Sequence, residues 1–156
     1  MIRQNIPTFT DLHPAGLMPL GWVMTPEELR KRTKTFALEI IRFCRRLPRT
    51  DEARVISWQL LRAGTGVGAN YRAVCRFRSD KDFIAKLGVA IEEADEAAFW
   101  LELLSDAGIV TATAMKNLYR EADELTRIFV SSRETARRNR RAKLRGQTTK
   151  SRTARS

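Results

Sequence analysis

Four segments of the chain repeat apolar residues at alternating steps of three and four, which is typical of helices that bury one face. The first segment begins at Thr25, Pro26 and Glu28, which supply an N-cap, a first-turn proline and the acid of a capping box. This helix is expected to run to about Leu47, because Pro48 cannot continue it. Its apolar stripe is Leu29, Thr33, Phe36, Ile40, Phe43 and Leu47.

A second and a third helix are expected at 51–78 and 80–107. Ser79 and Asp82 form a capping box between them, so the two segments predict an antiparallel hairpin. The second stripe is Ile56, Leu60, Ala63, Val67, Asn70 and Val74. The third stripe is Phe83, Leu87, Ala90, Ala94, Ala97, Leu101 and Leu104. Asn70 occupies a core position in this pattern, where a buried amide can fix helix register at some cost in stability.

A fourth helix is expected to begin near 111–113, after Gly108 ends the third. Its stripe is Met115, Leu118, Ala122, Leu125 and Phe129. Short connections make consecutive helices antiparallel neighbours. The sequence therefore predicts an all-α fold, an up-down-up-down four-helix bundle at 25–133. An irregular N-terminal arm at 1–24 and a disordered basic C-terminal tail at 134–156 flank it.

The central third of the chain resembles the four helix bundle protein family, which is related to proteins encoded by intervening sequences in 23S ribosomal RNA genes. The matching residues are Gln59-Leu60-Leu61-Arg62, Gly68-Ala69-Asn70-Tyr71-Arg72, Arg78-Ser79, Lys81-Asp82-Phe83-Ile84, Lys86-Leu87, Glu93-Ala94-Asp95-Glu96 and Trp100-Leu101-Glu102-Leu103-Leu104. The resemblance implies a four-helix bundle, often a ring-shaped homopentamer. It also implies a relation to accessory proteins of diversity-generating retroelements, which bind RNA and a reverse transcriptase.

Positive charge is concentrated near the C-terminus. The 156 residues are enough for one domain, and their formal net charge is +11. Residues 133–156 contain ten Lys/Arg and one acid, a composition that suits contact with nucleic acid or an anionic membrane, or a solvated end without a partner. No apolar run approaches the roughly 18 residues that span a bilayer, so we expect a cytoplasmic protein without a membrane partner.

The sequence contains no recognisable catalytic or metal-binding constellation. Cys44 and Cys75 lie in different helices without metal-type spacing, and the only histidine, His13, lies in the N-terminal arm. The third helix carries an acidic band, which we expect to pair with Arg62, Arg72 or arginines of the first helix. The band consists of Glu92, Glu93, Asp95, Glu96, Glu102 and Asp106. Di-iron bundles need Glu-x-x-His pairs, so we expect no metal, no cofactor and no enzymatic activity.

Glycines at 64, 66 and 68 lie within the second expected helix, where each costs about 1 kcal/mol relative to alanine. Gly64 and Gly68 share a face, and the absence of side chains there would let another backbone approach. A phosphate-binding loop is the competing interpretation, but the segment lacks the lysine and the preceding strand of a P-loop.

The topology of the expected bundle gathers cations at one pole. Arg76-Phe77-Arg78 interleaves an aromatic with two cations, which suits stacking and phosphate contact, although Phe77 could instead pack on the third helix. The candidate nucleic-acid-binding residues are Arg30, Lys31, Arg32, Lys34, Arg76, Arg78, Lys81, Arg137, Arg138, Arg140, Arg141, Lys143 and Arg145. Candidate structural or interface residues are Arg62, Asn70, Arg72, Asp95, Glu96, Phe99 and Trp100.

Two functions fit these observations. The first is a non-catalytic accessory protein that binds RNA or DNA through phosphates and forms a homo-oligomer, by resemblance a pentamer with a possible reverse transcriptase partner. The alternative is a homo-oligomeric protein-interaction scaffold that does not touch nucleic acid. Salt-dependent binding of generic RNA separates them, because phosphate contacts weaken steeply as salt rises.

Overall fold

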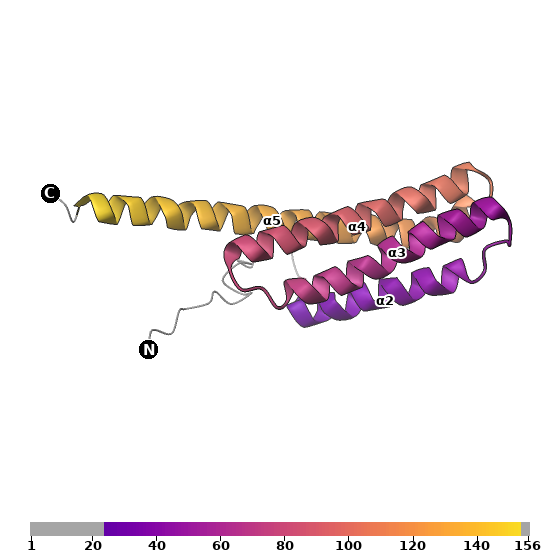
Figure 1. Ribbon diagram of the computed structural model, residues 1–156, viewed down its shortest axis with the longest axis horizontal. Coiled ribbons are helices and arrows are strands. Elements are labelled where there is room, and N and C mark those ends of the chain that lie inside the picture. Colours follow the sequence, from indigo (N-terminus) through magenta and orange to yellow (C-terminus); the bar gives the residue numbers. More distant parts are fainter. Residues whose placement is uncertain (1–23, 154–156) are drawn as a thin grey trace.

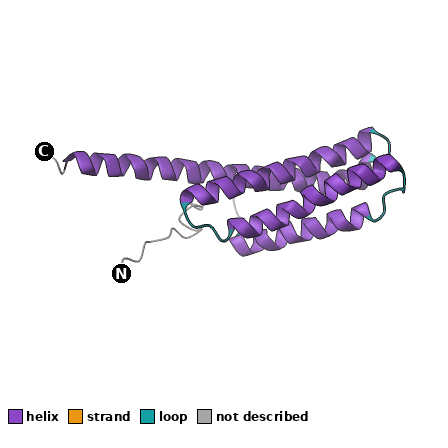
Figure 2. Ribbon diagram, viewed as in Figure 1, coloured by secondary structure: helices purple, strands orange, loops and turns teal. Residues whose placement is uncertain are grey.

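A computed structural model describes residues 24–153, with side chains described to 146, and contains four helices (Figures 1 and 2). They are α2 (Pro26–Cys44), α3 (Asp51–Val74), α4 (Asp80–Asp106) and α5 (Ala112–Thr153). The N-terminal arm expected at 1–24 lies outside the described residues except for Met24. None of the helices in the described range is long and apolar enough to cross a membrane.

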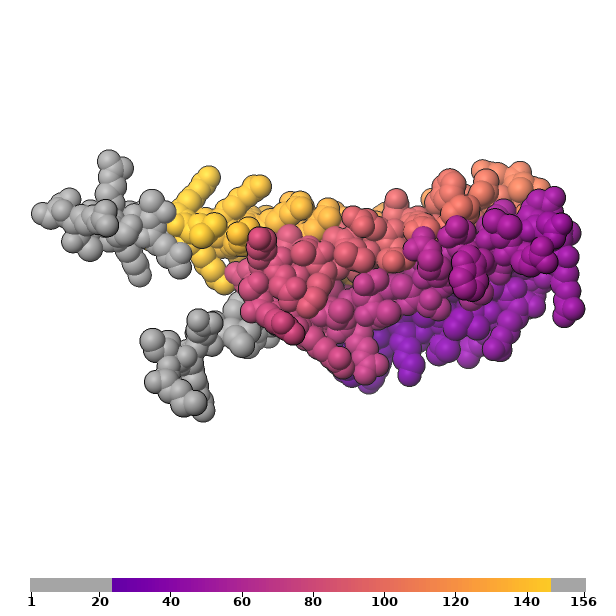
Figure 3. All heavy atoms as spheres, in the orientation of Figure 1, coloured from indigo at the N-terminus to yellow at the C-terminus, as the bar shows by residue number. Residues whose placement is uncertain are grey.

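Consecutive helices run antiparallel and pack side by side, which confirms the up-down-up-down bundle (Figure 1). The start of α2 and the α3–α4 connection lie at one end, which we call the basic end, and α5 projects beyond it (Figure 3). The α2–α3 and α4–α5 connections lie at the opposite end, which we call the far end. α2 and α5 close the bundle through fewer contacts than the other neighbours.

The buried faces follow the expected stripes closely in three helices. All seven stripe residues of α4 are buried, and Leu29, Thr33, Phe36, Ile40 and Phe43 are buried on α2. On α5 the stripe is buried from Leu118 onward, whereas Met115 is half-buried.

The expectation of a buried Asn70 was wrong, because Tyr71 takes the core position. Tyr71 is 1% exposed and stacks on Phe129 of α5, with ring centroids 5.3 Å apart. Asn70 is half-buried, and its amide nitrogen donates to the Gly66 carbonyl at 3.0 Å. Alternating steps of three and four average 3.5 residues, so the pattern drifts around a helix with 3.6 residues per turn.

Polar caps define the helix starts as expected. Glu28 N–H donates to the Thr25 hydroxyl at 3.2 Å, and Thr25 N–H donates to the Glu28 carboxylate at 2.6 Å. At α4, Asp82 N–H donates to the Ser79 hydroxyl at 3.1 Å. Gly108, after α4, has a φ of +68°, which a glycine adopts without a Cβ penalty.

Two helices end earlier than expected. α2 stops at Cys44, where Arg46 N–H and Leu47 N–H form tighter turns onto Phe43 and Cys44 carbonyls. α3 stops at Val74 rather than Arg78. The Arg78 N–H donates to the Asp82 carboxylate at 2.9 Å, so this residue already belongs to the cap of α4.

The largest difference from the expected fold is at the C-terminus. The boundary expected between 133 and 134 falls inside a continuous helix, because α5 extends to Thr153. Thr135 and Ala136 are buried, and Lys143 Nζ lies 3.1 Å from the Asp80 carboxylate at the start of α4. Arginine, lysine and alanine favour helices, and no glycine or proline interrupts the segment before Gly146. The part of the expected disordered tail that the structure describes is therefore helical.

The glycines of α3 confirm a close approach of α2. A Cβ on Gly64 would lie 2.8 Å from two carbons of Ile40, and a Cβ on Gly68 would lie 3.3 Å from the Thr33 carbonyl oxygen. At Gly66 the space is taken by the Glu93 carboxylate of α4. The three glycines lie inside a helix, so they do not form a phosphate-binding loop.

Alanine substitutions at two glycines should change stability in opposite directions. Gly88→Ala meets no atom closer than 3.7 Å and should stabilise the fold by about 0.5–1 kcal/mol through helix propensity. Gly64→Ala gains the same propensity but forces Ile40 to shift, and overpacking typically costs about 1–3 kcal/mol. Chemical denaturation of both variants measures the difference; a stabilised Gly64→Ala protein would contradict the tight α2–α3 contact.

Candidate nucleic-acid interface

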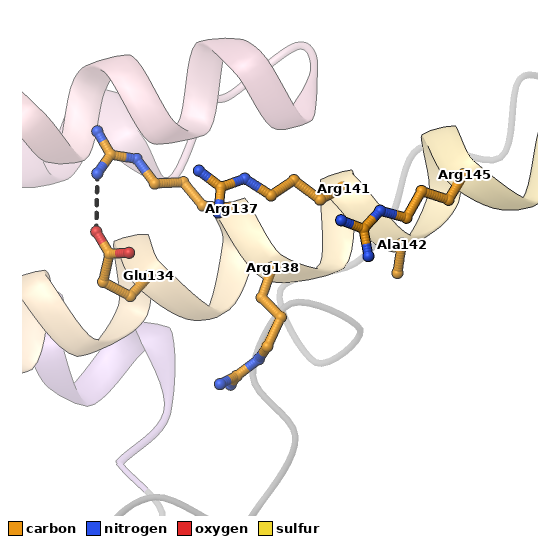
Figure 4. A pocket seen from close by; sticks show the side chains of 6 residues that line it. All are labelled: Glu134, Arg137, Arg138, Arg141, Ala142 and Arg145. Carbon is orange, nitrogen blue, oxygen red and sulfur yellow. Dashed lines mark hydrogen bonds and ion pairs between the residues drawn. The ribbon is translucent and has the colours of Figure 1, made fainter.

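Four arginines lie close together along α5 near the basic end (Figure 4). We call Arg137, Arg138, Arg141 and Arg145 the arginine stripe. With Glu134 and Ala142 they line a shallow surface groove. Arg137, Arg141 and Arg145 follow one another at four-residue intervals, whereas Arg138 projects from a different side of the helix (Figure 4).

The stripe presents regularly spaced cations to solvent. A helix rises about 1.5 Å per residue, so arginines four residues apart are about 6 Å apart along the axis. One Arg137 Nη lies 2.8 Å from the Glu134 carboxylate, and Arg138 Nη2 lies 3.5 Å from the Thr135 hydroxyl. Arg137, Arg138 and Arg141 are exposed, so their guanidinium groups remain accessible to an anion.

The other expected cations of the basic end divide into two groups. Arg140 and the cations of the α2, α3 and α4 ends are exposed and form no ion pair within residues 24–146. These cations near the helix ends are Lys31, Lys34, Arg76, Arg78 and Lys81. Arg30 is paired with Glu27 at 2.7 Å, and Lys143 holds Asp80. Arg30 and Lys143, which were expected to contact nucleic acid, are therefore already paired with carboxylates of the same chain.

Arg32 has a structural role rather than the expected phosphate contact. Its Nε donates to Glu121 at 2.6 Å and its Nη2 to the same carboxylate at 2.7 Å, which ties α2 to α5. A further bond reaches Glu124. The hydrogen bond to Glu121 raises the pKa of the Arg32 guanidinium, so this cation stays charged and engaged.

Phe77 is not available for base stacking. Its ring packs edge-on against Phe83 at a centroid distance of 5.2 Å, and it lies against the hydrophobic core. The interpretation in which Phe77 packs on the helix of residues 80–106 is therefore the correct one. Arg76 and Arg78, on either side of it, are in the connection between α3 and α4.

The acidic band of α4 pairs with only one of the expected arginines. Arg62 forms an ion pair with Glu96, and Glu96 also accepts a hydrogen bond from Trp100 Nε1 at 3.1 Å. The Trp100 hydrogen bond and the Arg62 contact lower the pKa of Glu96. Arg72 and Asp95 are exposed and form no ion pair in the described range, and the α2 arginines do not reach α4.

Glu93 is the least solvated carboxylate of this band. Its Oε2 is buried and has no hydrogen-bond partner among the described residues. Burial raises its pKa, an effect that Arg62 partly offsets. The carboxylate occupies the space beside Gly66, so its position follows from packing.

The sequence analysis missed a second group of cations. Arg42, Arg45, Arg46 and Arg49 are all exposed around the α2–α3 connection at the far end. Four arginines within eight residues were the available signal. The simple picture of one basic pole is therefore incomplete, although cations near the end of a helix also interact favourably with its dipole.

The part of the chain that the structure describes contains no cluster of side chains suited to holding a metal ion. Cys44 and Cys75 are free, and burial raises the pKa of both thiols. The arrangement that the structure does provide is a set of exposed guanidinium groups, which suits phosphate binding.

The fold and its exposed cations define a helical-bundle protein with a basic, extended last helix. Residues 27–131 match the model of the 23S rRNA-intervening sequence protein family, so the chain belongs to this family. A solved structure similar to it is a protein of unknown function from the S23 ribosomal protein family of Bacteroides thetaiotaomicron. The two chains are 32% identical in sequence, and their structures superpose with a TM-score of 0.62. The match covers 66% of this chain and 95% of the other. No curated protein matches the chain.

Proposed function

We propose that this protein is a non-catalytic accessory protein that binds RNA or DNA through the phosphate backbone. The observation that carries the proposal is the arginine stripe, in which Arg137, Arg141 and Arg145 recur at steps of about 6 Å along the helix axis. Each arginine can donate two parallel hydrogen bonds to a phosphate. Because these contacts do not read base edges, binding is largely independent of sequence.

The rest of the basic end supports this proposal. Lys81 of α4 is exposed, as are Arg76 and Arg78 of the α3–α4 connection, at the end from which α5 projects. Together with the stripe they form a broad cationic surface that raises the local concentration of polyanions and their association rate. The name of the family, which refers to an intervening sequence of 23S rRNA, agrees with an RNA-related role.

Direct binding tests the proposal against a protein scaffold that does not touch nucleic acid. Fluorescence anisotropy of the full chain should show binding to two unrelated RNA duplexes with similar affinities at about 50 mM salt. The scaffold alternative expects no binding to either duplex. A reverse transcriptase, which the family resemblance implies as a partner, would then be tested by co-purification.

Self-association is part of the same proposal. Phe99 is 51% exposed on α4 and contacts the half-buried Trp100 at a ring-centroid distance of 4.8 Å. Exposed aromatics of this kind are enriched in interface cores. Light scattering should give a mass that is a multiple of 17.9 kDa, by resemblance five-fold, and Phe99→Arg should lower it. A mass of 17.9 kDa for the native chain at micromolar concentration would count against assembly.

A further inference from the structure

Trp58 of α3 is the most exposed of the large apolar side chains in the described residues. It is 70% exposed, although tryptophan is normally a residue of cores and interfaces. Trp58 is not packed in the bundle core and does not belong to the arginine stripe. A tryptophan left this open presents an aromatic face that a partner can cover.

Arginines lie one turn away from Trp58 on both sides. Arg54 and Arg62 are four residues before and after it, so the three side chains share one face of α3. The Arg54 side chain is 79% exposed and pairs with Asp51, and the Arg62 side chain is 51% exposed and pairs with Glu96. Exposed ion pairs of this kind are weak, so a phosphate can compete for both guanidinium groups.

The surroundings of Trp58 differ from those of Phe99, the other exposed large aromatic among the described residues. Phe99 has Asp95 and Glu102 within one turn on α4, both exposed carboxylates. Trp58 lies two turns into α3, close along the chain to the exposed arginines of the far end. Trp58 therefore lies between two arginines whose ion pairs a phosphate can replace, whereas the carboxylates next to Phe99 repel a polyanion.

We propose that Arg54, Trp58 and Arg62 form a second nucleic-acid site, specific for single-stranded segments. An unpaired base stacks on the indole ring while the two arginines contact the flanking phosphates, the combination used by single-strand-binding proteins. Bases inside a duplex are already stacked on each other and cannot reach Trp58. This inference rests on the proposed nucleic-acid function and adds the class of ligand.

The two sites are far enough apart to act independently. α3 continues for 16 residues after Trp58, which corresponds to about 24 Å of helix, and the arginine stripe lies near the opposite end of the molecule. The Debye length at physiological salt is about 8 Å, so the charges of one site have little effect on the binding of phosphate at the other. One RNA with a stem and a loop could therefore contact both sites.

Affinities for a single strand and a duplex test the inference on the full chain. Labelled oligo(U) and a labelled RNA duplex are titrated by anisotropy with native protein, Trp58→Ala, Trp58→Tyr and Phe99→Ala. Trp58→Ala should weaken oligo(U) binding about tenfold, and leave duplex binding within about twofold. Trp58→Tyr keeps an aromatic face and should retain most of the oligo(U) affinity.

Phe99→Ala is the matched control, because it removes an exposed aromatic from an acidic setting. If it alters assembly, both affinities should fall together and their ratio should stay constant. The inference is overturned if Trp58→Ala leaves the ratio of the oligo(U) affinity to the duplex affinity unchanged. This includes a variant that changes the molecular mass of the assembly and lowers the two affinities equally. Absence of binding to either RNA by the native protein would instead refute the proposed function itself.

Discussion

Replacing the arginine stripe by glutamine is expected to weaken duplex RNA binding on the order of a hundredfold at physiological salt. The variant carries Arg137→Gln, Arg138→Gln, Arg141→Gln and Arg145→Gln. Each substitution removes a proposed phosphate contact but keeps a good helix former, so α5 should remain helical. Anisotropy titrations measure the affinity, and far-UV circular dichroism checks the helix content.

A matched control removes the same number of positive charges, four, from other helical positions of the bundle. It carries Arg42→Gln, Lys116→Gln, Arg120→Gln and Arg127→Gln, all at exposed positions. Both variants have a formal net charge of about +7 instead of +11. If affinity depended on net charge alone, the two variants would bind equally, and the stripe would have no special role. Substitution is preferable to deleting 134–156, because a deletion would also remove the buried Thr135 and Ala136.

Tyr71→Ala should lower the free energy of unfolding by about 3–5 kcal/mol, the usual cost of removing a large buried aromatic. Tyr71 is 1% exposed, and its ring stacks on Phe129, so its loss opens a cavity between α3 and α5. Thermal unfolding should show a fall in Tm of roughly 10 °C or more.

Tyr71→Phe is the control for this prediction. It keeps the ring and removes a hydroxyl that is buried without a hydrogen-bond partner among the described residues, so stability should change by no more than about 1 kcal/mol. Equal losses in both variants would contradict an account based on ring packing. Protein concentration must be held constant, because the proposed self-association would add to apparent stability.

Helix starts and most core residues could be predicted from sequence because they depend on local chemistry. The capping box at Thr25 and the N-cap at Ser79 act within four residues, and the α4 stripe is regular enough to place all seven buried positions. Asn70 and Tyr71 could not be assigned in this way. Which of two adjacent residues on a helix faces the core depends on how the neighbouring helix packs. On α3 the glycines allow α2 to approach closely.

The candidate site was predicted less completely. Composition identified the cations of 137–145, but the single-sequence analysis expected a disordered tail, since a dense charge run lacks an apolar stripe. The segment is helical because Thr135 and Ala136 still pack and Lys143 contacts Asp80, which are long-range contacts. Long-range contacts also explain Arg32, whose acidic partners lie 89 and 92 residues away.

The exposure of Trp58 and Phe77 could not be deduced from their neighbours in sequence either. Both are aromatics close to arginines, yet Phe77 packs on Phe83 and Trp58 is open to solvent. The difference is set by which face of each segment meets another helix. Sequence reasoning therefore left both interpretations of Phe77 open and assigned no role to Trp58.

The salt dependence of RNA binding tests the central claim most directly. The logarithm of the association constant is measured against the logarithm of salt concentration between about 50 and 200 mM, for the native chain, the stripe variant and the matched control. Each phosphate contact contributes roughly 0.7–0.9 to the slope. We expect a steep slope for the native chain and the control, and a slope shallower by about three for the stripe variant. Equal slopes for all three proteins would contradict phosphate binding by the arginine stripe.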